Sequence, residues 1–160
     1  MRLSLSMTWV TVLTLTLAGC GTGPPREPVS GKVMIDGKPL DEGEIYFAPT
    51  AGAGPTAGGK IENGDYAIPS DQGPASGPHQ VLITSTQPTG RKLVDEDDTN
   101  VKIDEIVETI PGRYNDRSEL KVDVKAGGNN AFDFDLKGRI DPTKAPRLRV
   151  PRRQGPRRSR

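Results

Sequence analysis

One histidine, His79, is the sole candidate for a histidine general base in this 160-residue chain. A Ser-His-Asp triad would need that histidine beside a serine and a carboxylate. Pro78 and Gln80 place it at the start of a predicted strand, where we expect a partly exposed residue at a strand edge. A zinc-protease motif needs two spaced histidines with a glutamate, so one histidine excludes it. We therefore expect no catalytic residues, no metal site, no cofactor and no enzymatic activity.

Acidic side chains gather at two places. The run Asp95-Glu96-Asp97-Asp98, with Asn100, carries oxygen atoms of the kind that bind Ca²⁺. It lacks the alternation and the downstream glutamate of an EF-hand loop, which favours a solvated acidic loop. Asp133 and Asp135 share one face of a predicted strand, and a polar outer face explains both.

Two tyrosines, Tyr66 and Tyr114, could stack on sugar rings. Tyr66 lies on the face of Ile68, so we expect it in the core, and we expect Tyr114 to hold an irregular connection in place. Only 4% of the residues are aromatic, which does not support a sugar-binding platform.

The only cysteine, Cys20, ends the run Leu17-Ala18-Gly19-Cys20 and cannot form an internal disulfide bond. It follows Arg2 and the apolar stretch 3–17, which is shorter than the ~20 residues of a membrane-spanning helix. The tetrapeptide resembles a bacterial lipobox, which implies cleavage between Gly19 and Cys20 and lipidation of Cys20. An uncleaved membrane helix is the alternative. We expect a signal peptide at 1–19 and a lipid-anchored protein of the cell envelope, on the periplasmic side or the cell surface; Gly21 leaves the choice of membrane open.

The charge is unevenly distributed. Residues 20–138 hold 12 basic and 20 acidic residues, whereas 139–160 hold nine basic residues and one aspartate. Like charges and prolines predict that 139–160 is a disordered basic tail. Such a tail could attract the acidic body, contact anionic lipid headgroups, or be a solvated segment without a function. We do not expect nucleic acid as a partner, because no aromatic residues accompany the charges. Its candidate contacts are Arg147, Arg149, Arg152, Arg153, Arg157, Arg158 and Arg160.

The rest of the chain reads as short strands. After a tether at 20–28, apolar residues alternate with polar ones over 29–35, 44–48, 60–62, 65–68, 80–85, 120–124 and 132–136. Asp36-Gly37 and Asn63-Gly64 suit tight hairpin turns. The segment 87–118 is the least regular: the spacing of Ile103, Ile106, Val107 and Ile110 allows one or two helical turns, and a long extended connection is equally compatible. About seven strands in one domain at 29–138 predict an all-β fold, an antiparallel β-sandwich.

Several of these segments, in order, resemble the carboxypeptidase regulatory-like domain, in a version abundant in planctomycete-type lipoproteins. They begin with Val29-Ser30-Gly31-Lys32-Val33, Asp36-Gly37-Lys38-Pro39-Leu40 and Gly43-Glu44-Ile45-Tyr46-Phe47. They continue with Gly64-Asp65-Tyr66, the segment 77–83, Ile110-Pro111-Gly112-Arg113-Tyr114-Asn115, Lys125-Ala126-Gly127-Gly128-Asn129 and the segment 132–136. The resemblance implies a transthyretin-like Greek-key sandwich without peptidase activity. We expect a non-enzymatic structural or protein-interaction module that meets an envelope protein or glycan; the alternative is a carbohydrate- or peptide-binding module.

Overall fold

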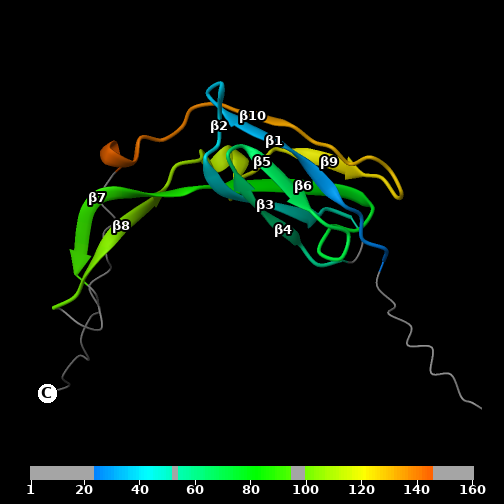
Figure 1. Ribbon diagram of the computed structural model, residues 1–160, viewed down its shortest axis with the longest axis horizontal. Helices are drawn as coiled ribbons and strands as arrows, with labels where there is room; N and C mark the ends of the chain where they lie inside the picture. Colours follow the sequence, from blue (N-terminus) through cyan, green and yellow to red (C-terminus); the bar gives the residue numbers. More distant parts are fainter. Residues whose placement is uncertain (1–23, 52–53, 95–99, 146–160) are drawn as a thin grey trace, which may run out of the picture.

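The structure is a computed structural model that describes residues 24–51, 54–94 and 100–145. These residues form strands and two short 3₁₀-helices, with no α-helix among them, so the predicted all-β class is confirmed (Figure 1). The predicted signal helix lies outside the described residues. The elements are β1 (Val29–Ile35), β2 (Lys38–Pro39), β3 (Glu42–Pro49), β4 (Ala57–Glu62), β5 (Asp65–Ile68), β6 (Gly77–Thr84), β7 (Thr86–Val94), β8 (Lys102–Glu108), η1 (Gly112–Tyr114), β9 (Lys121–Val124), β10 (Phe134–Leu136) and η2 (Pro142–Lys144).

Strand alternation builds the core as the sequence predicts. Every second residue of the main strands points inward, because successive side chains of a strand face opposite sides of the sheet. The fully buried apolar residues include Val33, Ile45, Phe47, Val81, Ile83 and Leu136. Tyr66 is also buried in this core, as predicted, and its ring packs near Phe47 and Phe134.

Both predicted tight turns form hairpins. Asp36 and Gly37 adopt positive φ angles of 51° and 79° between β1 and β2. Asn63 and Gly64 do the same, at 52° and 84°, between β4 and β5. Two consecutive positive φ values are the geometry that matches the twist of a two-residue hairpin, and Asn, Asp and Gly tolerate it best.

One continuous sheet curls around the core, in the order β10-β1-β5-β4-β3-β6-β9, with β2 paired to β1. The expectation of a purely antiparallel sheet is wrong at one place: β10 runs parallel to β1, from Val33 opposite Phe134 to Ile35 opposite Leu136. The chain crosses from β9, at one end of the sheet order, to β10 at the other. This crossing makes the last pairing parallel.

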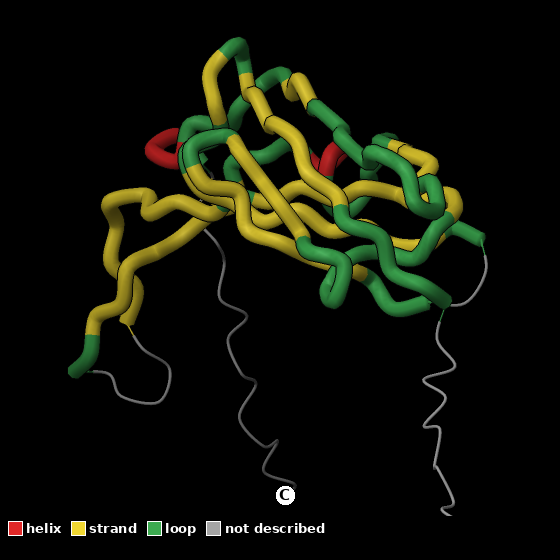
Figure 2. Tube along the Cα trace, turned by 45° about the vertical axis from the view of Figure 1, so that its right-hand side comes forward, coloured by secondary structure: helices red, strands yellow, loops and turns green. Residues whose placement is uncertain are grey.

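A two-stranded arm projects from the sheet (Figures 1 and 2). It consists of β7 and β8, which pair antiparallel with a register shift between Pro88 and Lys92. The helical alternative for residues 103–110 is therefore wrong, and the extended alternative holds. Ile and Val are stiff at χ1 and favour strands, which outweighs their helical spacing here.

The ordered body extends beyond 29–138 at both ends, which corrects two expected boundaries. In the predicted tether, Arg26 pairs with Ala75, and the buried Glu27 accepts a hydrogen bond from the Gly127 backbone N–H at 3.0 Å. In the predicted tail, residues 139–145 include η2 and pack on the arm, since Arg91 donates to the Ala145 carbonyl at 3.1 Å. The expectation of disorder is therefore wrong for 139–145, because backbone and carboxylate contacts hold this segment despite its composition. Residues 146–160 lie outside the described part of the chain.

Candidate functional site

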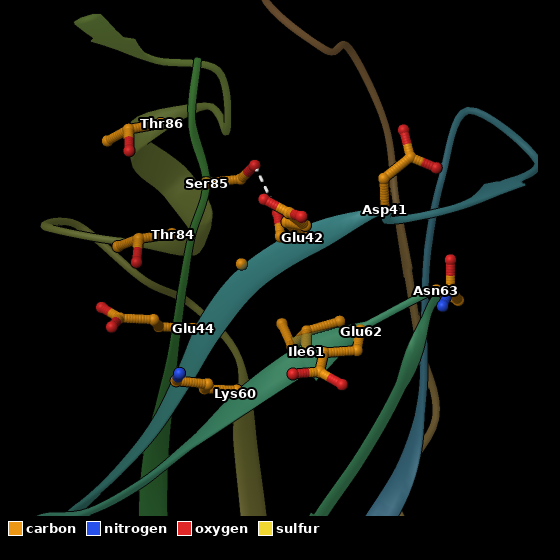
Figure 3. A pocket seen from close by; sticks show the side chains of 11 residues that line it. Asp41, Glu42, Glu44, Lys60, Ile61, Glu62, Asn63, Thr84, Ser85 and Thr86 are labelled. Atoms are coloured by element: carbon orange, nitrogen blue, oxygen red, sulfur yellow. Dashed lines mark hydrogen bonds between the residues drawn. The ribbon is translucent and has the colours of Figure 1, made fainter.

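An acidic groove of about 620 Å³ opens on the surface of the sheet (Figure 3). It lies where the start of β3 and the end of β4 meet the junction of β6 and β7. Its lining residues, which define the acidic groove, are Asp41, Glu42, Gly43, Glu44, Lys60, Ile61, Glu62, Asn63, Thr84, Ser85 and Thr86. Four carboxylates and one lysine make its charge strongly negative.

Sheet register explains why the charge collects here. Glu42 pairs directly with Glu62, and Glu44 pairs with Lys60, across β3 and β4. Like charges directly opposite one another destabilise a sheet, whereas opposite charges stabilise it. The Glu42–Glu62 pair is therefore an unfavourable element that a bound cationic group would relieve.

Neighbouring hydrogen bonds fix part of the groove. The Tyr46 hydroxyl donates to Glu44 at 2.6 Å, and this hydrogen bond raises the pKa of Tyr46. The buried Ser85 hydroxyl donates to the Glu42 carbonyl oxygen at 2.7 Å. This hydrogen bond attaches the β6–β7 junction to β3.

The candidate general base, His79, lies far from the groove. His79 lies on the same strand face as Ser85 but six positions away, which corresponds to about 20 Å along a strand. Its imidazole cannot activate the Ser85 hydroxyl over that distance. Among the described residues, no group of three or more His, Cys, Asp or Glu side chains is placed to hold a metal ion. The groove can attract a cationic group, because its four carboxylates outnumber its one lysine.

The expected environment of His79 is wrong. The side chain is 2% exposed rather than partly exposed, because alternation along β6 places it on the core face with Val81 and Ile83. Its Nδ1 lies 2.9 Å from the Gly77 carbonyl oxygen, and its buried Nε2 has no hydrogen-bond partner. His79 is a core residue within the body of the sheet.

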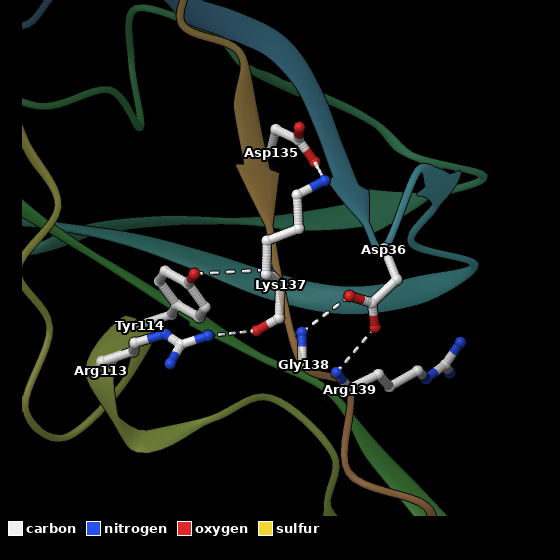
Figure 4. Close-up of polar contacts among 7 residues, drawn as sticks. All are labelled: Asp36, Arg113, Tyr114, Asp135, Lys137, Gly138 and Arg139. Carbon is white, nitrogen blue, oxygen red and sulfur yellow. Dashed lines mark hydrogen bonds and ion pairs between the residues drawn. The ribbon is translucent and has the colours of Figure 1, made fainter.

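Tyr114 does hold an irregular connection in place, as predicted (Figure 4). Its hydroxyl accepts a hydrogen bond from the Lys137 backbone N–H at 3.3 Å, and the Arg113 guanidinium lies 4.9 Å from its ring centroid. Arg113 also donates to the Lys137 carbonyl oxygen at 2.6 Å. Together these contacts attach η1 to the chain that leaves β10.

Asp36 secures the same region from the other side (Figure 4). Its carboxylate accepts hydrogen bonds from the backbone N–H groups of Gly138 and Arg139 at 2.8 and 2.9 Å. These two hydrogen bonds hold the pKa of Asp36 below its ordinary value of 3.8. They also direct residues 139–145 toward the arm.

The other predicted site residues divide into two groups. Asp133 and Asp135 are exposed, as the alternation predicts: Asp133 accepts from the Lys32 backbone N–H at 2.7 Å, and Asp135 pairs with Lys137 at 2.9 Å. Gly19, Cys20, the acidic run 95–98 and the seven tail arginines lie outside the described residues, and the expectations about them stay predictions. No helix among the described residues has the length and apolar character to cross a membrane.

The acidic groove was not predicted from the sequence. Its members come from three separate segments, and their register brings them together only in the folded sheet. The alternation did place Ile45 and Ser85 inward, which leaves Glu44 and Thr84 on the opposite faces of their strands. That signal alone does not show which strands lie side by side.

Comparison with known proteins gives little further guidance. No protein-family model matches the chain, and no curated protein matches it. One solved structure is similar: a 9R-lipoxygenase from Cyanothece PCC8801, at 15% sequence identity and a TM-score of 0.31. The match covers 83% of this chain but only 18% of the lipoxygenase chain. A likeness this weak carries no argument about fold or activity.

Proposed function

We propose that this protein is a non-enzymatic lipoprotein of the cell envelope, whose β-structured body is an interaction module held at a membrane surface. The observation that carries the proposal is the lipobox-like run Leu17-Ala18-Gly19-Cys20 after an apolar stretch. A diacylated cysteine supplies two acyl chains, and two chains anchor a protein stably, whereas one gives only marginal binding. The anchor lies on the periplasmic side or at the cell surface.

The ordered N-terminal residues support a body held close to that membrane. Arg26 and Glu27 belong to the fold, so only residues 21–25 separate it from Cys20. A fully extended chain of that length spans about 20 Å. The body would therefore meet partners that are themselves at the membrane surface.

We also infer that the curled sheet is a Greek-key β-sandwich of the transthyretin-like type, as in carboxypeptidase regulatory-like domains. The ordered series of motifs from Val29 to Leu136 supports this assignment. β1 supports it as well, because its first half pairs with β5 and its second half with β10. Superposition of the curled sheet on transthyretin-like domains tests the assignment.

A second candidate function, favoured by the acidic groove, is the binding of a basic peptide segment of an envelope protein. Glu42 and Glu62 face one another across the strands, and a guanidinium or ammonium group between them would offset their repulsion. The groove lining contains no aromatic residue, which argues against a sugar, because sugar sites use aromatic faces.

Metabolic labelling tests the anchor. Cells expressing the protein are given radiolabelled palmitate, and we expect label in the wild-type chain and none in Cys20→Ala. Label that persists in Cys20→Ala refutes the anchor. Cell fractionation of the same pair should move the variant from the membrane pellet to the soluble fraction.

An oligo-arginine peptide titration tests the groove. Glu42→Gln together with Glu62→Gln should weaken binding by about 2- to 30-fold, the range expected for two exposed ion pairs. The matched control is Glu119→Gln together with Asp123→Asn, which makes the same charge change at exposed positions outside the groove. Equal weakening by both pairs would mean that net charge, and not the groove, determines binding.

A further inference from the structure

The curled sheet ends at β9, which is an edge strand. It pairs with β6 on one side, and no strand pairs with its other side in the described part of the chain. An edge strand presents unpaired backbone N–H and C=O groups, to which a further strand can add. The register of β9 on β6 shows which groups these are.

Lys121 and Asp123 direct their backbone groups away from β6. Leu120 lies opposite Val81, and its carbonyl oxygen accepts a hydrogen bond from the Val81 N–H at 2.9 Å. Hydrogen-bonded and non-hydrogen-bonded pairs alternate along an antiparallel ladder. The residues that bond to β6 are therefore Leu120 and every second residue after it, and the residues between them point outward.

The residue opposite Asp123 supports this alternation. It is Pro78, which has no N–H group to donate. The Pro78 carbonyl oxygen accepts a hydrogen bond from the Thr50 N–H at 3.0 Å, on the side of β6 that faces β3. Pro78 therefore offers no backbone group to Asp123.

The outward positions on either side of this pair already have partners. The Glu119 N–H donates to the Arg113 carbonyl oxygen at 3.0 Å. The Lys125 N–H donates to the side-chain oxygen of Asn130 at 2.8 Å, and the Lys125 carbonyl oxygen accepts from the same amide at 3.0 Å. Among the described residues, the positions between them have no such partners. We call residues 121–123 the open edge of β9.

The side chains of the open edge complement a second copy of themselves. Lys121 and Asp123 are exposed and opposite in charge, with the half-buried Val122 between them. A two-fold axis at Val122 sets Lys121 of each copy opposite Asp123 of the other, so two opposite-charge pairs form across the strands, an arrangement that stabilises a sheet. Residues that direct their backbone groups toward each other also exchange two hydrogen bonds per pair. An axis at Asp123 would instead set two aspartates opposite one another.

The strand at the other end of the sheet, β10, lacks this complementarity. An axis at Phe134 would place Asp133 of one copy opposite Asp135 of the other, and like charges in that position are unfavourable. One position of β10's free side is also occupied, because the Lys137 N–H donates to the Tyr114 hydroxyl and the Lys137 carbonyl oxygen accepts from Arg113. The observations therefore favour β9.

We propose that two copies of this chain associate through the open edge of β9, antiparallel and in the register that pairs Lys121 with Asp123. The partners of Glu119 and Lys125 limit the new ladder to residues 121–123. An interface this small gives a weak, reversible dimer. The pairing does not depend on the lipid anchor or on the acidic groove, so it fails or succeeds separately from the proposed function.

Disulfide trapping tests the register in the full chain with Cys20→Ser, which removes the only native thiol. Val122→Cys sets the two thiols at the axis, where the Cα atoms of a non-hydrogen-bonded pair lie about 4.5 Å apart, within the range of a disulfide. The matched control is Lys125→Cys, which is more exposed but lies about 20 Å from its counterpart across the axis, six positions along the strand. We expect the disulfide between chains to form about tenfold faster in Val122→Cys, because pairing raises the local thiol concentration. Equal rates, or a faster control, overturn the proposal.

A charge exchange supplies a second test that needs no new bond. Sedimentation equilibrium of the full chain with Cys20→Ser, from about 10 μM to 1 mM, should show a monomer–dimer equilibrium. Lys121→Asp alone, or Asp123→Lys alone, should weaken dimerisation by about fourfold or more, because two opposite-charge pairs become two like-charge pairs. Combining the two substitutions restores opposite charges across the axis and should restore the dimer, while circular dichroism checks that each variant is folded. A monomer at every concentration, assembly beyond a dimer, or no recovery in the combined variant contradicts the pairing.

Discussion

Gly31 lies in the half of β1 that pairs with β5, two residues before the pairing with β10 begins, and replacing it with alanine should destabilise the fold strongly. Its φ angle is 155°, and a Cβ atom would lie 2.0 Å from the Phe132 carbonyl oxygen. That carbonyl cannot easily move away: the Phe132 N–H donates to Ser30 at 2.9 Å, and the Tyr66 hydroxyl donates to the carbonyl oxygen itself at 2.8 Å. The new methyl group would therefore clash with fixed backbone, and the alanine would also have to adopt an unfavourable φ angle.

The magnitude follows from these two effects. Forcing a methyl group into packed surroundings costs about 1–3 kcal/mol. A strained backbone conformation adds about 1–3 kcal/mol. Gly31→Ala should therefore lose about 2–6 kcal/mol of the roughly 5–15 kcal/mol that stabilises a typical domain.

Gly37→Ala is the matched control. Gly37 has a φ of 79° but nothing within 4 Å of the position a Cβ would take, so it carries the backbone cost without the clash. We expect it to lose about 1–2 kcal/mol. Urea unfolding followed by far-UV circular dichroism compares the two, since the only tryptophan, Trp9, lies in the predicted signal segment. Equal midpoints for the two variants would refute the close approach of β1 to Phe132.

Three further predictions concern single contacts. The folded-state pKa of Asp36 is depressed, so its carboxylate stabilises the protein above pH 3.8 and loses this effect as the pH falls through the folded pKa. The Asp36→Asn variant, which retains the turn, should be less stable than the wild type at neutral pH and equally stable in acid. A stability difference that does not change with pH contradicts this. Tyr66→Phe should cost about 0.5–1.5 kcal/mol in urea unfolding, the net contribution of a typical hydrogen bond, because the carbonyl of the partly buried Phe132 loses its partner; an unchanged midpoint would refute that. Truncation after Ala145 should weaken binding to anionic vesicles with little change in melting temperature. Truncation after Gly138 should increase hydrogen exchange in the arm more than truncation after Ala145 does, and equal exchange in both truncated proteins argues against the packing of residues 139–145.

Local features of the fold could be predicted from the sequence because their causes are local. The pairs Asp36-Gly37 and Asn63-Gly64 specify turns through their own backbone preferences. The inward alternation of Ile45 with Phe47, and of Val81 with Ile83, follows from the two-residue period of a strand. Neither inference requires knowing which strands become neighbours.

Features that depend on distant partners could not be predicted. The parallel pairing of β10 with β1 joins residues about a hundred positions apart, and alternation does not specify a partner. The acidic groove depends on the same kind of information, because Glu42, Glu62 and Thr86 come together only through sheet register. His79 was misplaced because its position in the sequence suggested an edge, while β3 and β9 flank β6 on both sides.

The two ends of the described chain suggest how the proposed anchor and the basic tail would act together. The start of β1 and the β7–β8 arm lie at opposite ends of the body in both views (Figures 1 and 2). The anchor at Cys20 would hold one end, and the tail arginines leave from the segment docked on the arm at the other. Two attachments at opposite ends reinforce each other only when both can reach the same surface. A body lying along the membrane meets that condition, and a body standing upright on its anchor does not.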